Sequence, residues 1–392
     1  MTRVEQTQLL VVGGGPVGLI AALCAAKRGL DVIVLERSFR GTARGHTTLL
    51  HPSSIRLLSE LGLAPLLLRS GQLLEHVELR VNSESQRIKL PLPAVALTQA
   101  LFEETLLQVL RKEEVDLRAP LEVTAVLQTD QYVDVKAARR EQLKAAASAG
   151  EERWEFSESS AIQAKFVIGA DGRHSRVRQS LGIGMATGPM DRYAMFEFPS
   201  DHPPEPTLVI STEFNHCITP LAGRRARCSF QLAPEAPWMA DLTFLGTLLQ
   251  ERAPQQELPH ELDWSDIVDF EPTLAETFGR RRVWLAGDSV HSASPLGVQS
   301  MNRGISEAYQ LVEAMAAVDS GTSALGEIAL VSRAQREDWQ RSLASDVDME
   351  LLPHAPRWPR GQLGEIMSAL PVSGSDLEAL LGELGIRRRS DV

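Results

Sequence analysis

Cysteine is scarce in this sequence, which contains only Cys24, Cys217 and Cys228, each among apolar neighbours. Three widely spaced cysteines do not form a disulfide framework, so we expect three buried thiols and a protein of the reducing cytoplasm. Histidine is also sparse, and the nine residues lack the spacing typical of metal ligands, so no metal site is expected.

The sequence also lacks a basic excess. Its 40 lysines and arginines are outnumbered by 51 aspartates and glutamates, which gives a formal net charge of −11. Nucleic-acid binding needs a basic surface, so the composition argues against a nucleic-acid partner. With 392 residues, 43% of them hydrophobic, the chain exceeds one compact core and is expected to form two interleaved domains and a tail.

Long uncharged apolar runs are missing except for residues 9–26. The Gly-Gly-Gly-Pro stretch at 13–16 interrupts this run, and the strand-like residues 31–36 follow it closely. A membrane span or a signal peptide is not interrupted in this way. The run therefore indicates a strand, a turn, a helix and a second strand, and no integral membrane segment is expected.

The turn in this run has the spacing of a dinucleotide-binding loop. Gly13 permits a tight turn, and Gly15 lets a phosphate approach the backbone. Gly18 allows the following helix, expected at 16–28, to pack closely on the strand. The free N–H groups at the start of this helix favour a diphosphate. Glu36, at the end of the second strand, is placed to accept hydrogen bonds from ribose hydroxyls.

Two further glycine-bearing signatures follow strand-like runs. In the first, residues 165–172 end in Asp-Gly, and the carboxylate is placed to cap a following helix. The second, residues 282–291, contains Gly287 and Asp288 and precedes Pro295. No second G-x-G-x-x-G is present, so any second nucleotide would bind without a Rossmann unit of its own.

In this order and at these spacings, the three signatures resemble the class A flavoprotein monooxygenases of the p-hydroxybenzoate hydroxylase type, over residues 8–316. The resemblance implies an α/β fold, in which a Rossmann-type FAD-binding domain is interleaved with a mixed β-sheet substrate domain and followed by a C-terminal helical region. We expect the FAD-binding domain at 1–70, 97–185 and 265–320, the substrate domain at 71–96 and 186–264, and the helical region at 321–392.

The resemblance implies that FAD is the bound cofactor, that NADPH or NADH reduces it transiently, and that O2 is the co-substrate. In the family, oxygen adds at the flavin 4a carbon, and the hydroperoxide then hydroxylates an aromatic ring or epoxidises a double bond. The protein would hold a small-molecule substrate near this oxygen and exclude water. Only Tyr193 of the three tyrosines lies in the predicted substrate sheet, so a phenolate site lined by tyrosines is not expected. The other side chains of this sheet are mainly apolar, which favours an apolar polyketide, quinolone or prenylated aromatic as substrate.

The resemblance also assigns the cofactor contacts. Asp288 would bind a ribityl hydroxyl, Gln99 would bind the ribityl chain, and Arg44 would lie near the flavin phosphates. Asp171 would serve the diphosphate region and nicotinamide use. The full set of expected contacts is Gly13, Gly15, Pro16, Val17, Gly18, Glu36, Arg37, Arg44, Gln99, Asp171, Gly287, Asp288, Pro295, Gly297, Ser300, Met301 and Asn302.

The loop after the third signature departs from the family pattern. Relatives usually have Gly-Gly-Gln-Gly before an Asn, whereas this chain has Gly-Val-Gln-Ser-Met-Asn at 297–302. The side chains of Val298 and Ser300 would push the loop away from the flavin ring or narrow the pocket. The helix expected at about 302–318 has an apolar face. In the family its N-terminus points at the pyrimidine end of the ring, where its partial positive charge favours the reduced anion.

Two histidines are the candidate catalytic bases. His216 lies in residues 214–220, at the family position of a strand over the flavin, and is predicted to deprotonate a phenol or a ring nitrogen. His46 is the second candidate. The alternative for His216 is a packed or exposed strand histidine with no catalytic role.

Two other functions stay open on the sequence alone. A flavin reductase or dehydrogenase on the same fold would saturate a prenyl or polyketide double bond without consuming oxygen. The altered loop at 297–302 also leaves open a non-redox role, with bound flavin as the scaffold for a cyclisation. The chain is expected to be a monomer or a homodimer.

Residue patterns predict the remaining elements. The Ala-, Lys- and Glu-rich residues 137–152 predict a solvated hairpin extension or a short mobile helix. A Pro-rich linker is expected at 353–371, and a leucine stripe at 377–384 predicts a closing helix that packs on its own domain. The second sheet is expected to contain a hairpin at 75–90 and strands at 193–198, 207–212, 216–219 and 227–232.

Overall fold

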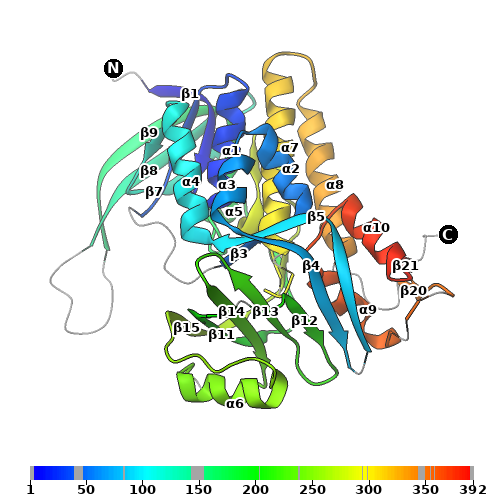
Figure 1. Cartoon of the computed structure of the whole chain (residues 1–392). Helices are drawn as coiled ribbons and strands as arrows, with labels where there is room; N and C mark the ends of the chain where they lie inside the picture. Colours follow the sequence, from blue (N-terminus) through cyan, green and yellow to red (C-terminus); the bar gives the residue numbers. More distant parts are fainter. Residues whose placement is uncertain are drawn as a thin grey trace.

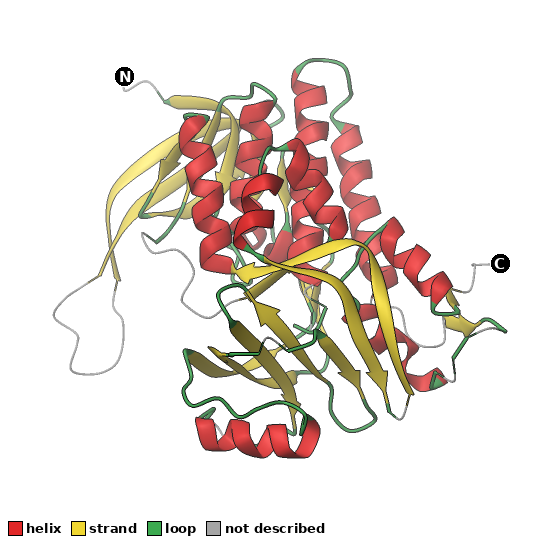
Figure 2. Cartoon of the chain, viewed as in Figure 1, coloured by secondary structure: helices red, strands yellow, loops and turns green. Residues whose placement is uncertain are grey.

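The protein, seen as a computed structural model, is built on two large β-sheets, with most helices gathered beside the first (Figure 1). Figure 2 shows these helices in the upper half of the molecule and the second sheet below them. The α/β class expected from the sequence is confirmed. The structure describes residues 4–38, 47–82, 84–142, 154–202, 204–236, 239–293, 295–297, 299–342, 349–353, 355–356 and 358–388.

The parallel strands of the first sheet end at a common edge. The sheet contains β1 (Glu5–Val12), β2 (Val32–Leu35), β6 (Asp116–Arg118), β7 (Leu121–Gln128), β8 (Val133–Gln142), β9 (Trp154–Gly169), β17 (Gly279–Arg280) and β18 (Val283–Leu285). The order is β17-β18-β9-β1-β2-β6, and β8 and β7 extend β9 as an antiparallel pair. Gly169 pairs with both Val12 and Leu285, and Val12 also pairs with Leu35. The turns after these strands therefore meet at one edge, where α/β sheets bind their ligands.

Helix α1 (Pro16–Lys27) is the centre of the first core. Its residues are nearly all apolar, and those from Leu19 to Ala25 are fully buried. Helices α4 (Gln99–Lys112) and α7 (Gln299–Asp319) pack on it. A Cβ at Gly18 would lie 2.0 Å from the carbonyl oxygen of Gly13, so only glycine lets α1 approach the turn after β1 this closely.

Shorter helices and a small sheet complete the connections of this half. They are α2 (Pro52–Glu60), α3 (Ala64–Ser70), α5 (Arg176–Ser180), the 3-10 helix η2 (Gly287–Ser289), and the strands β10 (Met185–Thr187), β16 (Thr273–Ala275) and β19 (His291–Ser292). Within the described ranges, no helix combines the length and the apolar character needed to cross a bilayer.

The second sheet has two covered faces. Its strands are β3 (Thr47–Leu50), β4 (Gln72–Val81), β5 (Glu84–Thr98), β11 (Asp191–Pro199), β12 (Thr207–Ile210), β13 (His216–Leu221), β14 (Arg225–Leu232) and β15 (Trp264–Phe270). They follow the order β15-β11-β14-β13-β12-β4-β5-β3. Helix α6 (Leu242–Arg252) covers the face that carries Ile218 and Phe230. The face that carries Cys217 and Leu221 packs on Leu296 and on the C-terminal region.

The C-terminal region lies against both halves of the molecule. Helix α8 (Gly326–Ser342) runs beside α7 (Figure 1). The chain then forms β20 (Met349–Leu351), the 3-10 helix η4 (Arg360–Gln362), α9 (Leu363–Ala369), α10 (Ser375–Glu383) and β21 (Ile386–Arg388), which pairs with β20. The predicted linker at 353–371 is wrong in its second half, because Leu363, Ile366 and Met367 of α9 are buried in the core of the second sheet.

Three other elements differ from the expectation. Helix α7 begins at Gln299 instead of about residue 302, so Ser300 and Met301 lie in its first turn. β3 and β15 pair in the second sheet, although they fall mainly in segments predicted for the FAD-binding domain. Residues 137–142, by contrast, form the end of β8 and pair with β9, in agreement with the predicted hairpin, and the rest of the extension at 143–152 lies outside the described residues.

Substituting Gly18 tests the close contact of α1 with β1. A methyl group at this position would overlap the Gly13 carbonyl, and overpacking of this kind costs about 1–3 kcal/mol. Gly18→Ala should therefore lower the thermal unfolding midpoint. The control is Gly382→Ala in α10, where no described atom lies within 4 Å of an added Cβ. Equal midpoints for Gly18→Ala and the unchanged chain would contradict the packing argument.

Candidate functional site

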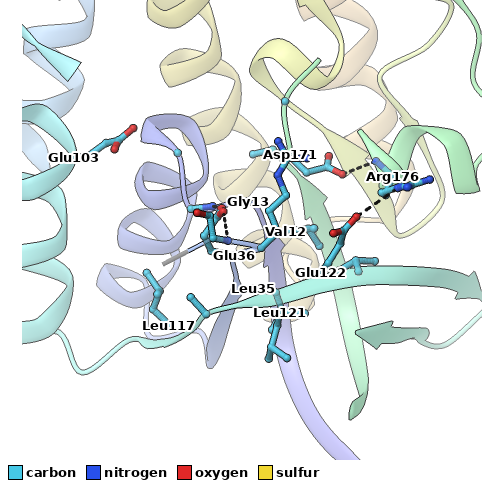
Figure 3. A pocket seen from close by; sticks show the side chains of 18 of the residues that line it. Val12, Gly13, Leu35, Glu36, Glu103, Leu117, Leu121, Glu122, Asp171 and Arg176 are labelled. Atoms are coloured by element: carbon cyan, nitrogen blue, oxygen red, sulfur yellow. Dashed lines mark hydrogen bonds and ion pairs between the residues drawn. The ribbon is translucent and has the colours of Figure 1, made fainter. Parts of the chain in front are cut away.

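A cavity of about 1330 Å³ lies at the carboxyl edge of the first sheet (Figure 3). The turn after β1 forms its floor, and Glu36, Glu103, Glu122 and Asp171 surround that turn. These carboxylates come from the residue after β2, from α4, from β7 and from the turn after β9, so the cavity is built from segments far apart in the sequence. Carboxylates, glycine backbone and apolar side chains such as Val12 and Leu35 line the cavity together, as is typical of a ligand pocket.

The glycine turn exposes backbone to this cavity. Gly13 has a φ of +111°, and a Cβ there would lie 2.2 Å from the carbonyl oxygen of Ala170, so the position requires glycine. A Cβ at Gly15 would meet no described atom within 4 Å, which leaves room for a ligand. Pro16 is the first residue of α1, and the amides of that first turn have no partner within the helix. The turn therefore offers amide donors and a helix dipole to an anionic group.

Glu36 closes β2 and is held by two backbone amides. Its Oε2 accepts a hydrogen bond from the Gly14 amide at 2.6 Å, and its Oε1 accepts one from the Ser38 amide at 2.9 Å. The next residue, Arg37, is exposed and also lines the cavity. Glu36 thus places an oriented carboxylate beside the glycine turn, as ribose recognition requires.

Asp171 follows β9 on the other side of the turn. Its Oδ2 accepts hydrogen bonds from the amides of Arg176 at 2.7 Å and Val177 at 3.2 Å, while Ser175 is the N-cap residue of α5. Its Oδ1 is buried and has no hydrogen-bond partner among the described residues. Burial raises the pKa of this carboxyl. Asp171 therefore combines a helix-capping oxygen with a spare acceptor in the cavity wall.

Val17 connects the glycine turn to two other predicted contacts. Its Cγ2 would lie 3.0 Å from a Cβ at Gly287 and 2.7 Å from a Cβ at Gly304 of α7. The Gly287 amide donates to Oε2 of Glu307 at 2.9 Å, and the neighbouring Asp288 is exposed. The start of α1, the turn after β18 and the first turns of α7 are therefore locked together.

The first turn of α7 is fixed by the segment that precedes α2. Asn302 Oδ1 accepts hydrogen bonds from the His51 amide at 2.8 Å and from Ser54 Oγ at 2.7 Å, and Asn302 Nδ2 donates to the Leu49 carbonyl at 2.8 Å. The Sδ of Met301 accepts a hydrogen bond from Thr48 Oγ1 at 2.9 Å. Asn302 and Met301 thus hold the loop, although the resemblance assigned them to the cofactor.

Four other predicted cofactor contacts are Ser300 in the first turn of α7, Pro295 and Gly297 in the loop before it, and Gln99 at the start of α4. Ser300 Oγ is buried, and none of the described residues is its hydrogen-bond partner. Pro295 is half-buried and Gly297 is buried in the preceding loop. Gln99 begins α4, and its Nε2 donates to Oε1 of Glu103, which lines the cavity, at 2.8 Å.

His216 is not brought to either part of the site. It lies on the α6-facing side of the second sheet, where it stacks on Phe230 with ring centroids 5.3 Å apart. The side chain is buried, and neither ring nitrogen has a hydrogen-bond partner among the described residues. Burial, together with the nearby Arg252 and Arg80, lowers its pKa to about 4. The arrangement is that of a packed strand histidine, and a catalytic role for His216 stays a prediction without support from its position.

Arg44 and His46 lie outside the described residues, so their assigned roles also stay predictions. Sequence reasoning missed Glu307, which bonds the Gly287 amide and the Nε2 of His291 at 2.7 Å. The signal for Glu307 in the sequence was a carboxylate on the apolar face of the helix predicted at about 302–318. It also missed His51, whose Nε2 lies 2.8 Å from the Gly297 carbonyl oxygen, and no local pattern marks that residue.

Removal of the Glu36 carboxylate should weaken FAD binding. Hydrogen bonds to charged groups contribute roughly 1.5–3 kcal/mol, so Glu36→Ala should raise the Kd by about tenfold to hundredfold in a calorimetric titration. Glu104→Ala is the matched control, because Glu104 is exposed on α4 next to the cavity-lining Glu103. Unchanged affinity in Glu36→Ala would remove this residue from the site.

The pH dependence of stability tests the placement of His216. Below pH ~6.5 the unfolded chain binds a proton that the folded protein does not accept until about pH 4, so stability falls on acidification. At pH 5 this costs about 2 kcal/mol. His216→Leu should therefore unfold at a higher temperature than the unchanged chain at pH 5, with a smaller difference at pH 7.5. The same difference at both pH values would mean that folding does not lower the pKa of this imidazole.

Comparison with known proteins agrees with this geometry. A family model described as "FAD binding domain" matches residues 6–335. The FAD-dependent monooxygenase apdD of Emericella nidulans is 25% identical over 80% of this chain and 56% of its own length. The rifampicin monooxygenase of Rhodococcus hoagii is 23% identical over 87% of this chain and 69% of its own length. The chain thus spans between about half and two thirds of the length of these curated relatives.

Solved structures share the fold. The p-nitrophenol 4-monooxygenase PnpA of Pseudomonas putida superimposes with a TM-score of 0.73 at 21% identity, covering 97% of this chain and 95% of that one. Aklavinone-11 hydroxylase, solved with FAD and aklavinone, gives a TM-score of 0.66 at 22% identity over 86% of this chain and 70% of that one. The family model covers most of the chain and all the turns that line the cavity, so the chain belongs to the FAD-binding-domain family.

Proposed function

We propose that the chain is an FAD-dependent monooxygenase with NADPH or NADH as transient reductant and O2 as co-substrate. In this proposal it hydroxylates or epoxidises a small apolar aromatic or related secondary metabolite. One observation carries the proposal: the glycine turn, the Gly287-Asp288 turn and the start of α7 are locked around Val17, and an apolar face of the second sheet lies beside them.

The cavity residues fit the adenosine diphosphate half of FAD. The cavity volume of about 1330 Å³ exceeds the roughly 300–1,000 Å³ typical of small-ligand pockets, which suits an extended dinucleotide. The amides at the start of α1 would bind the diphosphate, and Glu36 would accept hydrogen bonds from the ribose. Bound ligand would also supply a partner for the buried Oδ1 of Asp171.

The first turn of α7 fits the polar edge of the flavin ring. The partial positive charge at this helix start favours a group that carries negative charge, and the hydroxyl of Ser300 is a further buried donor. Asp288, exposed beside Val17, would accept a hydrogen bond from the ribityl chain. Bound FAD would supply the electron-transfer and oxygen-activating chemistry, while these residues orient it.

The second sheet would hold the substrate. Its inner face packs apolar side chains, among them Leu49, Leu74 and Leu208, next to Leu296 in the loop before α7. An apolar wall excludes water from the reacting groups and favours an apolar ring. Relatives are named for 3-(3-hydroxy-phenyl)propionate and rifampicin, and a solved neighbour is named for p-nitrophenol. These names support an aromatic substrate for this chain.

The same proposal assigns FAD to the first sheet and its helices, and the substrate to the second sheet.

The three cysteines are buried free thiols, and burial raises the pKa of Cys24 to about 12. Unreactive thiols of this kind suit a reducing cytoplasm.

The proposal predicts a yellow protein that takes up FAD and oxidises NADPH or NADH faster when an aromatic substrate is added. With ¹⁸O-labelled O2, one labelled oxygen atom should appear in each product molecule. The measurement combines oxygen uptake with mass spectrometry of products from a panel of aromatic and isoprenoid compounds, with Glu36→Ala as the cofactor-deficient control.

Other outcomes identify the alternatives. Saturation of a double bond without oxygen uptake would support the reductase. Product formation while the flavin stays oxidised would support the cyclase. A colourless protein that binds no added FAD would overturn all three functions.

A further inference from the structure

The C-terminal segment Ser368–Ser373 lies directly on the loop before α7. A Cβ at Gly297 would lie 2.0 Å from the Ser368 carbonyl oxygen, so the two backbones touch. The side chain of Gln299 reinforces this contact, because its Nε2 lies 2.8 Å from the Leu370 carbonyl oxygen and 3.2 Å from that of Val372. The end of α9 and the residues that follow it thus cover the start of α7.

His51 provides a second attachment. Its Nε2 donates to the Gly297 carbonyl at 2.8 Å, so its Nδ1 is the acceptor for the Ser373 hydroxyl at 3.2 Å. Ser53 Oγ also lies 2.7 Å from Ser373 Oγ. His51 is fully buried, and burial lowers its pKa to about 3, so this attachment persists through the physiological pH range.

A small, mainly apolar chamber lies beside the segment, and Pro371 is the residue of the segment that lines it. Its lining includes Leu49, Leu74, Leu208, Thr219, Leu296 and Pro371, and its volume is about 20 Å³. A cavity that binds benzene has about 150 Å³, whereas 20 Å³ holds about one water molecule. No aromatic ring fits while the segment is in this position.

The closed arrangement leaves a polar atom of Gln299 without a partner. Gln299 Oε1 is buried, and the described residues provide no hydrogen-bond partner for it. Buried polar atoms without partners destabilise the state that contains them. At the far end of the segment, Gly374 has a φ of +64°, and a Cβ there would meet no described atom within 4 Å. The incompletely satisfied contact of Gln299 favours opening, and the glycine at 374 leaves the backbone room to turn at the end of the segment.

We propose that Ser368–Ser373 is the gate of the substrate chamber: it lifts from Gln299 and His51 to admit an apolar ring, and Pro371 then forms part of the wall that limits ring size. The proposal rests on the function proposed above. It concerns access and ring size, whereas oxygen chemistry depends on FAD.

Hydrogen–deuterium exchange of the FAD-loaded full chain tests the gate without a known substrate. Amides of 368–374 should exchange through local opening, while those of β1 stay protected. Gln299→Leu should speed exchange of this segment about tenfold, because it removes the attachment and keeps a similar side-chain volume. Ser368→Ala is the matched control, since it keeps the carbonyl that Gly297 contacts, and it should exchange like the unchanged chain.

A reversible lock gives the opposite change. In the double variant Ser53→Cys, Ser373→Cys, the two positions are close enough for a disulfide. The oxidised form should keep its FAD content, suppress exchange of 368–374 about tenfold, and recover after dithiothreitol. Binding of 1-naphthol, followed by fluorescence, should be lost in the oxidised form and restored on reduction.

Exchange of 368–374 as slow as that of β1, unaffected by Gln299→Leu, would overturn the gate and make the segment a fixed wall. Equal 1-naphthol affinity in the oxidised and reduced forms would also overturn it. Both results are independent of oxygenation. A gate that opens in a protein that does not oxygenate would contradict the proposed function alone.

Discussion

The contact of Val17 with Gly287 and Gly304 is the constraint on which the site depends. It joins the start of α1 to the turn after β18 and to the first turns of α7. The start of α1 lies hundreds of residues before the other two segments in the sequence. Both partners are glycines, so a single added methyl group would separate them. Glu307 strengthens this junction, because it binds the Gly287 amide and also His291, which stacks on Trp339 of α8.

Two kinds of surface meet at this junction. On one side, parallel strands end in register and present backbone amides and carboxylates, which suits a charged, hydroxyl-rich ligand. On the other side, the second sheet presents aliphatic side chains. A molecule with a polar tail and an aromatic head can satisfy both surfaces at once, and FAD has this form. In the proposed function, the substrate would bind against this aliphatic surface.

The features that sequence reasoning predicted depend on short stretches of chain. The turn at Gly13, the carboxylate at Glu36 and the turn at Asp171 follow from local backbone geometry, which glycine and strand patterns report directly. The family was identified correctly from these stretches.

The features that it missed depend on pairing and packing over long distances. The side chain of His216 faces α6 because β13 pairs with β14 in a register that places His216 opposite Phe230. The alternation of residues along a strand does not reveal this register. The buried attachment of His51 to Ser373 joins residues 322 positions apart, and α9 packs on β12 and on the core of the second sheet. Proline-rich composition at 353–371 suggested a linker, since prolines interrupt local secondary structure. Composition does not report contacts with distant parts of the chain, so the packing of α9 was missed.

The attachment of Gln299 has a consequence for how this fold diversifies. Among the described residues, the partners of its Nε2 are main-chain carbonyls at the end of α9 and just after it, and every residue type supplies that group. If the segment forms the gate proposed above, mutations in it can alter the side chains that would touch a bound molecule while preserving the hydrogen bonds that hold the segment. Selection for new compounds can act on these few positions without disturbing the nucleotide-binding half of the protein.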